Sequence, residues 1–161
     1  MWQTYAVKRQ TMKLAFEENP QTIIHNKSYE VERKWLFHGT VEHNIRKIQR
    51  QGFNRSFAGR NAVAYGKGVY FARDSSYSVD STYSVPDANG LQHVFMCRVA
   101  VGDWCGGTYG QLTPNSKPHN RLELFDSTVD NADNPSVFVV YHDAQAYPEY
   151  LVKFRCHPQT D

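Results

Sequence analysis

Apolar residues recur at helical spacing near the start of the chain and predict a helix over residues 2–18. The apolar stripe consists of Trp2, Tyr5, Met12 and Phe16. Asn19-Pro20 ends the pattern, because a proline disfavours helical backbone in the residue before it. We expect the stripe to face the core rather than a ligand. Residues 21–33 are polar and predict a surface connection, in which Thr22-Ile23-Ile24 form a brief strand.

A second amphipathic segment follows a short apolar run at residues 34–38. We expect that run to form a strand that Gly39-Thr40 breaks. Thr40 then caps a helix that extends to about Gln51. The inner face of this helix is expected to consist of Val41, Ile45 and Ile48. Gly52 suits the C-terminal end of the helix, where a left-handed residue is common.

The rest of the chain alternates short apolar runs with loops. Residues 53–65 show no period and predict a long loop, a class of segment that often carries function. Asp74 or Ser75 is expected to cap a short helix reaching about Tyr83, and residues 102–120 predict a second loop. Strands are predicted over residues 69–72, 94–101, 137–141 and 150–154. This order is typical of a strand-rich α+β domain.

Composition narrows the class of protein. A chain of 161 residues can form one domain with its own hydrophobic core, and we expect residues 1–161 to be that domain. Hydrophobic residues make up 40 % and charged residues 21 %, which is a globular composition. The three cysteines lack C-x-x-C spacing, which argues against zinc and against a disulfide framework. We expect an intracellular protein, cytoplasmic or nuclear, with neither a metal nor a membrane-spanning segment.

Charge is distributed unevenly although the formal net charge is only +2. From His43 to Arg73 there is no acidic residue. The basic residues in this segment are Arg46, Lys47, Arg50, Arg55, Arg60, Lys67 and Arg73. Such a segment attracts an anionic ligand, either a pyrophosphate or a phosphate backbone. The alternative interpretation is a solvated basic face with no ligand.

Four ordered stretches carry a resemblance to a known family. They are Leu36-Phe37-His38-Gly39-Thr40, residues 66–72 (GKGVYFA), residues 134–141 (NPSVFVVY) and residues 145–151 (QAYPEYL). Together they resemble the catalytic domain of the poly(ADP-ribose) polymerase superfamily, the diphtheria-toxin-like ADP-ribosyltransferases. The macrodomain-bearing mono-ADP-ribosyltransferase branch is most similar, and residues 52–56 and 61–65 strengthen that placement. The likeness extends from about Trp2 to the C-terminus.

The resemblance implies a fold and a reaction. The fold is a split-β arrangement of two packed, mainly antiparallel sheets with short flanking helices. The reaction cleaves the bond between nicotinamide and ribose in NAD, which is the substrate, and transfers ADP-ribose. Such domains usually have a strand and a helix upstream of the point where this chain begins, so it is either trimmed or a minimal natural version. The helical regulatory domain of the DNA-damage-activated members has no counterpart here.

The resemblance also assigns roles to individual residues. His38 would hold a hydroxyl of the adenosine ribose, the Gly39 backbone and the Ser78 hydroxyl would bind the nicotinamide carboxamide, and Tyr70 would wall the nicotinamide ribose. Tyr83 is the expected nicotinamide stacker, with Tyr77 the less favoured choice, and residues 53–65 match a loop over NAD. The full set of implied NAD-binding residues is His38, Gly39, Thr40, Arg55, Asn61, Tyr70, Ala72, Tyr77, Ser78 and Tyr83.

Val137 departs from the polymer-forming relatives, which have a glutamate at this position. The implied catalytic positions are therefore His38, Tyr70 and Val137. A valine has neither the lone pair nor the charge to polarise the hydroxyl of a growing chain, so transfer of a single unit is expected. The acceptor is expected to be a protein, automodification included, and a nucleic-acid end stays open. Two alternatives to mono-transfer are a catalytically inactive NAD-binding or interaction module and an RNA-directed transferase of the same fold.

Overall fold

The computed structural model describes residues 1–54 and 63–156 and begins with the predicted helix, α1 (Trp2–Glu18). Tyr5, Met12 and Phe16 are buried along one side of α1, as predicted, whereas Trp2, the first residue of the expected stripe, is exposed. Polar contacts fix the helix as well, because the Tyr5 hydroxyl donates to Glu32 Oε2 at 2.6 Å. Arg9 approaches the same carboxylate at 3.1 Å, so α1 is joined to the first strand of the sheet.

The segment after α1 differs from the expectation. Pro20–Thr22 form a short 3-10 helix, η1, and the predicted strand over residues 22–24 is wrong. The N–H groups of Thr22 and Ile23 donate to the Asn19 and Pro20 carbonyls, and those of residues 24, 25 and 26 donate to Asp103. Those donors are therefore not free to form a strand ladder.

Most strands belong to one seven-stranded sheet in the order β4-β7-β8-β2-β1-β3-β9. Its strands are β1 (Glu32–Thr40), β2 (Val69–Ala72), β3 (Gln92–Ala100), β4 (Trp104–Gly106), β7 (Ser127–Val129), β8 (Val137–Val140) and β9 (Ala146–Phe154). All neighbours are antiparallel except β4 and β7. A separate two-stranded sheet consists of β5 (Ser116–Lys117) and β6 (Asn120–Leu124). The α+β class is confirmed.

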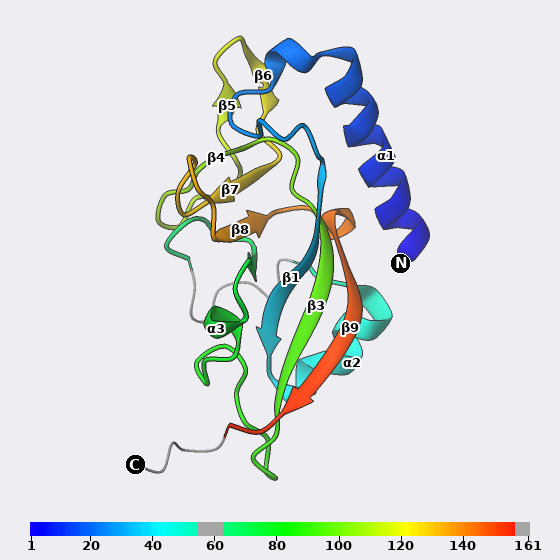
Figure 1. Cartoon of the computed structure of the whole chain (residues 1–161), viewed down its shortest axis with the longest axis vertical. Coiled ribbons are helices and arrows are strands. Elements are labelled where there is room, and N and C mark those ends of the chain that lie inside the picture. Colours follow the sequence, from blue (N-terminus) through cyan, green and yellow to red (C-terminus); the bar gives the residue numbers. More distant parts are fainter. Residues whose placement is uncertain (55–62, 157–161) are drawn as a thin grey trace.

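The large sheet has two halves. The long strands β1, β3 and β9 lie side by side, and the shorter strands β2, β8, β7 and β4 form the other half (Figure 1). The halves meet at one residue pair, Phe37 of β1 and Ala72 of β2. The two sheets expected for a split-β fold are therefore joined at this point into one.

Several element boundaries differ from those predicted. The strand β1 continues through Gly39 and Thr40, which pair with Val94 and His93, so the predicted break at Gly39-Thr40 is wrong. The helix α2 (Glu42–Gln51) consequently begins after Val41 and has no side-chain cap, which overturns the capping role of Thr40. Its C-terminal glycine, Gly52, has a φ of 73°, as its position predicted.

Further along the chain, α3 (Ser75–Ser78) ends before Tyr83, and turns follow it. The predicted loop over residues 102–120 contains β4 and β5. Another 3-10 helix, η3 (Asp143–Gln145), leads into β9, which begins four residues before the strand expected at 150–154. In the described part of the chain, none of the helices has the length and apolar character needed to cross a membrane.

The strands β2 and β8 each separate two groups of side chains. Phe71 and Phe138 belong to the main core, together with residues of β1, β3 and α2. Their sequence neighbours Tyr70 and Val137 point to the other face, because successive strand residues alternate, and pack there with Val139 and Tyr141. This second face carries three of the residues that the resemblance singles out, Tyr70, Tyr77 and Val137.

Candidate active site

His38 lies in β1, and its imidazole is fixed by a backbone contact. Its Nδ1 is 2.7 Å from the Tyr70 carbonyl oxygen. Because a carbonyl only accepts, Nδ1 carries the proton and Nε2 is left as an acceptor nitrogen. The ring also contacts Phe53 and Phe71, with centroid distances of 4.9 and 5.4 Å. Burial lowers the pKa of His38, which favours the neutral imidazole.

Tyr70 follows His38 in this chain of contacts, on the neighbouring strand. Its hydroxyl donates to the Gly66 carbonyl at 2.7 Å and accepts from the Tyr65 N–H at 2.9 Å. Burial raises the pKa of Tyr70 to about 12, so the phenol stays neutral. Gly66 has a φ of 129° and lies where a Cβ would overlap the Tyr141 hydroxyl, so only glycine suits this turn. The turn and the Tyr70 ring therefore fix each other.

Gly39 is where a second segment crosses the sheet. A Cβ at this position would lie 2.5 Å from the Ser78 carbonyl oxygen and 3.0 Å from Tyr83 Cβ and the Ser84 nitrogen. The absence of a side chain lets the segment after α3 lie directly on β1. In Figure 1, α3 and the green segment after it lie beside β1 and β2. Gly39, Ser78 and Tyr83, which are up to 44 positions apart in sequence, thus meet.

Tyr77 and Tyr83 form a stacked pair. Their ring centroids are 4.6 Å apart and the interplanar angle is 17°. Tyr77 also packs against the cluster that contains Tyr70 and Val137. Burial, together with a hydrogen bond to Tyr83, raises the pKa of Tyr77. One face of the Tyr83 ring is therefore supported by Tyr77.

Ser78 is the last residue of α3, and its side chain is buried. The Ser78 hydroxyl is not among the buried side-chain atoms of the described residues that lack a hydrogen-bond partner. The Ser78 atom that lies against Gly39 is its backbone carbonyl oxygen rather than its hydroxyl.

Val137 opens β8 directly opposite Ala72, and both side chains are buried. Its backbone N–H donates to Asp130 Oδ1 at 3.1 Å. The same carboxylate accepts from the N–H and the hydroxyl of Ser136. Burial works against ionisation of Asp130, but these bonds hold its pKa below the usual value. Sequence reasoning missed Asp130, because a lone aspartate in a polar turn gives no signal of the strand end that it fixes.

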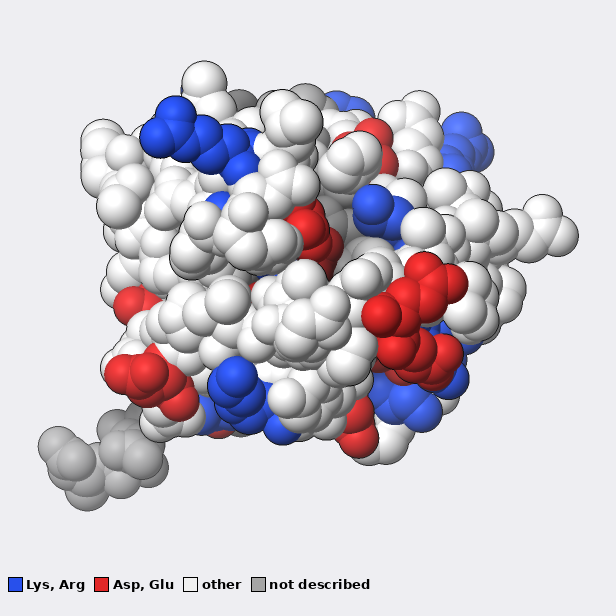
Figure 2. Space-filling model, turned by 90° about the horizontal axis from the view of Figure 1, so that it is seen from above, with Lys and Arg blue, Asp and Glu red and all other residues white. Residues whose placement is uncertain are grey.

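The other predicted residues fall into three groups. Thr40 and Ala72 are buried in β1 and β2. Arg55 and Asn61 lie outside the described residues. Of the basic residues, Arg46, Lys47 and Arg50 are exposed on α2, whereas Arg73 pairs with Asp74 at 3.1 Å. Figure 2 shows acidic and basic side chains together on the face seen from above, so that face has no charge of a single sign.

In the ranges 1–54 and 63–156, no three side chains of His, Cys, Asp or Glu are grouped so that they could hold a metal ion.

A family model, the poly(ADP-ribose) polymerase catalytic domain, matches residues 1–120, which include the elements from α1 to β5. The chain belongs to this family. The poly(ADP-ribose) polymerase model thus covers most of the site, although Val137 and Asp130 lie beyond the matched residues.

Curated relatives place the chain within the family. Protein mono-ADP-ribosyltransferase PARP14 of Homo sapiens is 46 % identical over 156 residues, which are 96 % of this chain and 8 % of the relative. Protein mono-ADP-ribosyltransferase PARP10 of Mus musculus is 44 % identical over 117 residues, 73 % of this chain and 12 % of the relative. Protein mono-ADP-ribosyltransferase PARP12 of Mus musculus is 37 % identical over 129 residues, which are 80 % of this chain and 18 % of the relative. This chain spans less than a fifth of each of these relatives.

Proposed function

We propose that this domain transfers one ADP-ribose unit from NAD to a protein acceptor and releases nicotinamide. The observation that carries the proposal is the approach of the Ser78–Ser84 segment to Gly39. It brings the Gly39 backbone, the buried Ser78 side chain and the Tyr83 ring together at one place on β1. The names of the curated relatives agree with this activity.

The chemistry makes modest demands on the protein. Cleavage of the nicotinamide–ribose bond develops oxocarbenium character at the ribose carbon, and the cationic nicotinamide leaves as a neutral molecule without a general acid. Catalysis then depends on geometry and on holding both halves of the dinucleotide. In our proposal the Gly39 backbone and the Ser78 hydroxyl hold the carboxamide, and Tyr83 stacks on the ring.

The remaining site residues would bind the riboses. The neutral His38 presents Nε2 as an acceptor for a ribose hydroxyl, because Nδ1 is already committed to the Tyr70 carbonyl. The Tyr70 ring, held in place by the Gly66 turn, would form the wall beside the nicotinamide ribose. Its own hydroxyl is satisfied by backbone groups, so its contribution is shape rather than proton transfer.

Val137 supports transfer of one unit. It packs among apolar and aromatic side chains beside Tyr70 and offers no group that could polarise an acceptor hydroxyl. The acceptor must therefore bring its own nucleophile, and a carboxylate is suitable. Automodification would follow wherever an acceptor side chain reaches the site. The exposed basic residues of α2 make a nucleic-acid end the second acceptor to test.

Incubation with labelled NAD tests the proposal. Wild-type protein should label itself or an added protein mixture, and mass spectrometry should find one ADP-ribose per modified residue. Ser78→Ala should reduce transfer, whereas Ser76→Ala, on the same helix but exposed, should not. NAD binding without transfer to protein or to RNA ends would indicate an inactive binding module. Transfer to RNA ends alone would identify the RNA-directed alternative.

A further inference from the structure

We propose that Gln92 is a positioning residue that holds the Tyr83 segment, defined as residues 79–84, in the conformation that binds nicotinamide. Gln92 is the first residue of β3 and its side chain is buried. Its importance for NAD rests on the proposed function, whereas its hold on the segment does not.

The Gln92 amide bridges the two ends of the Tyr83 segment. Its Nε2 lies 3.0 Å from the Val79 carbonyl oxygen and 2.9 Å from that of Ser84. The Ser84 hydroxyl is a third neighbour at 3.2 Å. A primary amide has two N–H donors, so one side chain can satisfy a carbonyl at each end of the turn. Tyr83 lies between these two tethered points.

The other contacts of the segment are mostly internal. The N–H groups of Tyr83 and Ser84 both donate to the Asp80 carbonyl at 3.0 Å, and the Thr82 N–H donates to the Asp80 carboxylate at 2.8 Å. These bonds shape the turn but do not attach it to the sheet. Gln92 does attach it, because β3 is paired with β1 on one side and β9 on the other.

Gln92 and Gly39 act on the segment together. Val94, which shares a strand face with Gln92, is paired with Gly39 across β1 and β3. Gly39 provides room for the segment, and Gln92 provides the hydrogen bonds that keep it there. Removing the amide should leave the fold intact but allow Tyr83 and Ser78 to sample other positions. Ordering them again would then oppose NAD binding.

A matched control is available in Gln145. Its side chain is equally buried, at 3 % exposure for both residues, and its Nε2 also donates to two carbonyls, those of Ala100 at 3.1 Å and Asp126 at 2.9 Å. Gln145 belongs to η3, which contacts α1 rather than the Tyr83 segment. Each substitution therefore removes a buried amide that donates to two carbonyls. Gln92→Met does so at the site, and Gln145→Met does so away from it.

The experiment measures steady-state kinetics with NAD and backbone hydrogen exchange on both variants and on wild type. For Gln92→Met we expect KM for NAD to rise roughly tenfold with kcat changed by less than about threefold, because the lost preorganisation affects binding. Hydrogen exchange should accelerate in residues 79–84. Gln145→Met should lower the urea midpoint about as much as Gln92→Met does. It should change neither KM for NAD nor hydrogen exchange in residues 79–84.

Each outcome bears on the proposal. Equal KM changes in both variants, or an unchanged KM in Gln92→Met, would overturn the positioning role. Unaltered exchange in residues 79–84 would overturn the tether whether or not NAD binds. A wild type that neither binds nor cleaves NAD, combined with faster exchange in Gln92→Met, would refute the proposed function alone. If Gln92→Met does not fold, Gln92→Asn, which keeps the amide but shortens its reach by one methylene, gives the same readouts.

Discussion

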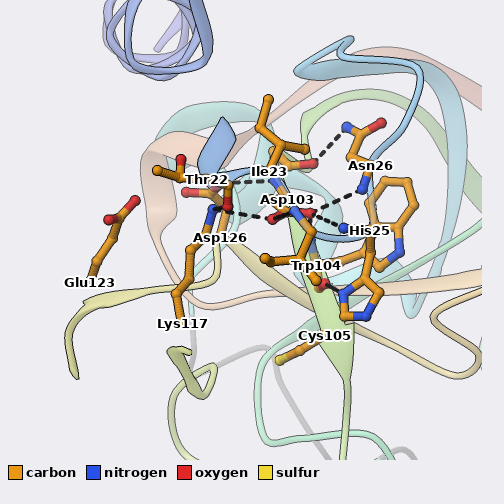
Figure 3. A network of polar contacts seen from close by, with 12 residues as sticks. Thr22, Ile23, His25, Asn26, Asp103, Trp104, Cys105, Lys117, Glu123 and Asp126 are labelled. Carbon is orange, nitrogen blue, oxygen red and sulfur yellow. Dashed lines mark hydrogen bonds and ion pairs between the residues drawn. The ribbon is translucent and has the colours of Figure 1, made fainter. Parts of the chain in front are cut away.

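The Lys117 ammonium lies 3.1 Å from the Asp103 carboxylate inside the protein, with both side chains almost wholly buried (Figure 3). Asp103 also accepts hydrogen bonds from the backbone N–H groups of residues 24, 25, 26 and 104. Lys117 donates in addition to the Thr22 carbonyl at 2.9 Å. Burial opposes ionisation of Asp103, but these partners hold its pKa below the usual value. The pair joins the chain after α1 to β4 and β5.

Replacing Asp103 should destabilise the protein strongly. Asp103→Asn leaves the buried Lys117 charge without its counter-ion, and we expect a loss of about 3–5 kcal/mol in the free energy of unfolding. Urea denaturation measures this loss. Asp133→Asn, an exposed position, serves as the control and should cost little. A cost for Asp103→Asn no larger than that of the control would show that the buried pair contributes nothing.

Asp126 should make stability fall as pH rises through the mildly acid range. Burial raises the pKa of Asp126 to about 6, above the value of about 3.9 in an unfolded chain. Between these two values the folded state binds more protons than the unfolded state, so the group's stabilising contribution is complete below about pH 4 and is lost by about pH 6. Between these pH values the urea midpoint of the wild type should fall more steeply with rising pH than that of Asp126→Asn, because asparagine does not titrate. If the urea midpoints of the wild type and Asp126→Asn differed by the same amount at every pH, the raised pKa of Asp126 would be contradicted.

The same region shows where prediction from sequence fails. The helix α1, the strands β2 and β8 and the end of α2 at Gly52 follow from local patterns, because periodicity and glycine conformation are local properties. The strand expected over residues 22–24 fails because a local 3-10 turn takes the N–H groups of residues 22 and 23, and the Asp103 carboxylate, 79 residues away, takes that of residue 24. Lys117, in a segment predicted as loop, gives no sign in the sequence of a buried partner.

The candidate site divides in the same way. Residues inside recognisable motifs, such as His38, Gly39 and Tyr70, can be selected from the sequence alone, and the fold brings them near Ser78 and Tyr83. Gln92 cannot be selected in that way, because its importance depends on the tertiary approach of residues 79–84 and not on any local pattern. The residue type of Thr40 favours a capping role, but pairing between β1 and β3 overrides that preference.

Gly39→Ala should weaken ligand binding through a single methyl group. The added Cβ would lie 2.5 Å from the Ser78 carbonyl oxygen, so the Tyr83 segment has to move. We expect nicotinamide affinity, measured by calorimetric titration, to fall at least tenfold, which corresponds to about 1.4 kcal/mol. Gly106→Ala is the matched control, since nothing lies within 4 Å of a Cβ there. Wild-type affinity in Gly39→Ala would mean that the segment can shift without consequence for the ligand.

Tyr83→Ala should weaken NAD binding by removing the stacking surface. An aromatic pair contributes about 0.5–1.5 kcal/mol beyond the area that it buries, so a loss of roughly tenfold in affinity is expected. Tyr83→Phe retains the ring and should retain most of the affinity. Tyr109, at 82 % exposure, provides the control substitution Tyr109→Ala. Unchanged NAD affinity in Tyr83→Ala would show that another residue stacks on nicotinamide. Tyr77 would be the first candidate, because its ring lies against that of Tyr83.

Val137→Glu should not by itself produce long polymers. The new carboxylate would be introduced among Tyr70, Val139 and Tyr141, and burial in this apolar cluster would raise its pKa and oppose the charged form. Elongation also requires a bound ADP-ribose chain as acceptor, which other loops must hold. Gel mobility and mass spectrometry of the modified protein should therefore still find single units, with lower activity and stability. Val137→Gln controls for the change in side-chain shape. A ladder of products from Val137→Glu, but not from Val137→Gln, would show that this one side chain decides between one ADP-ribose unit and many.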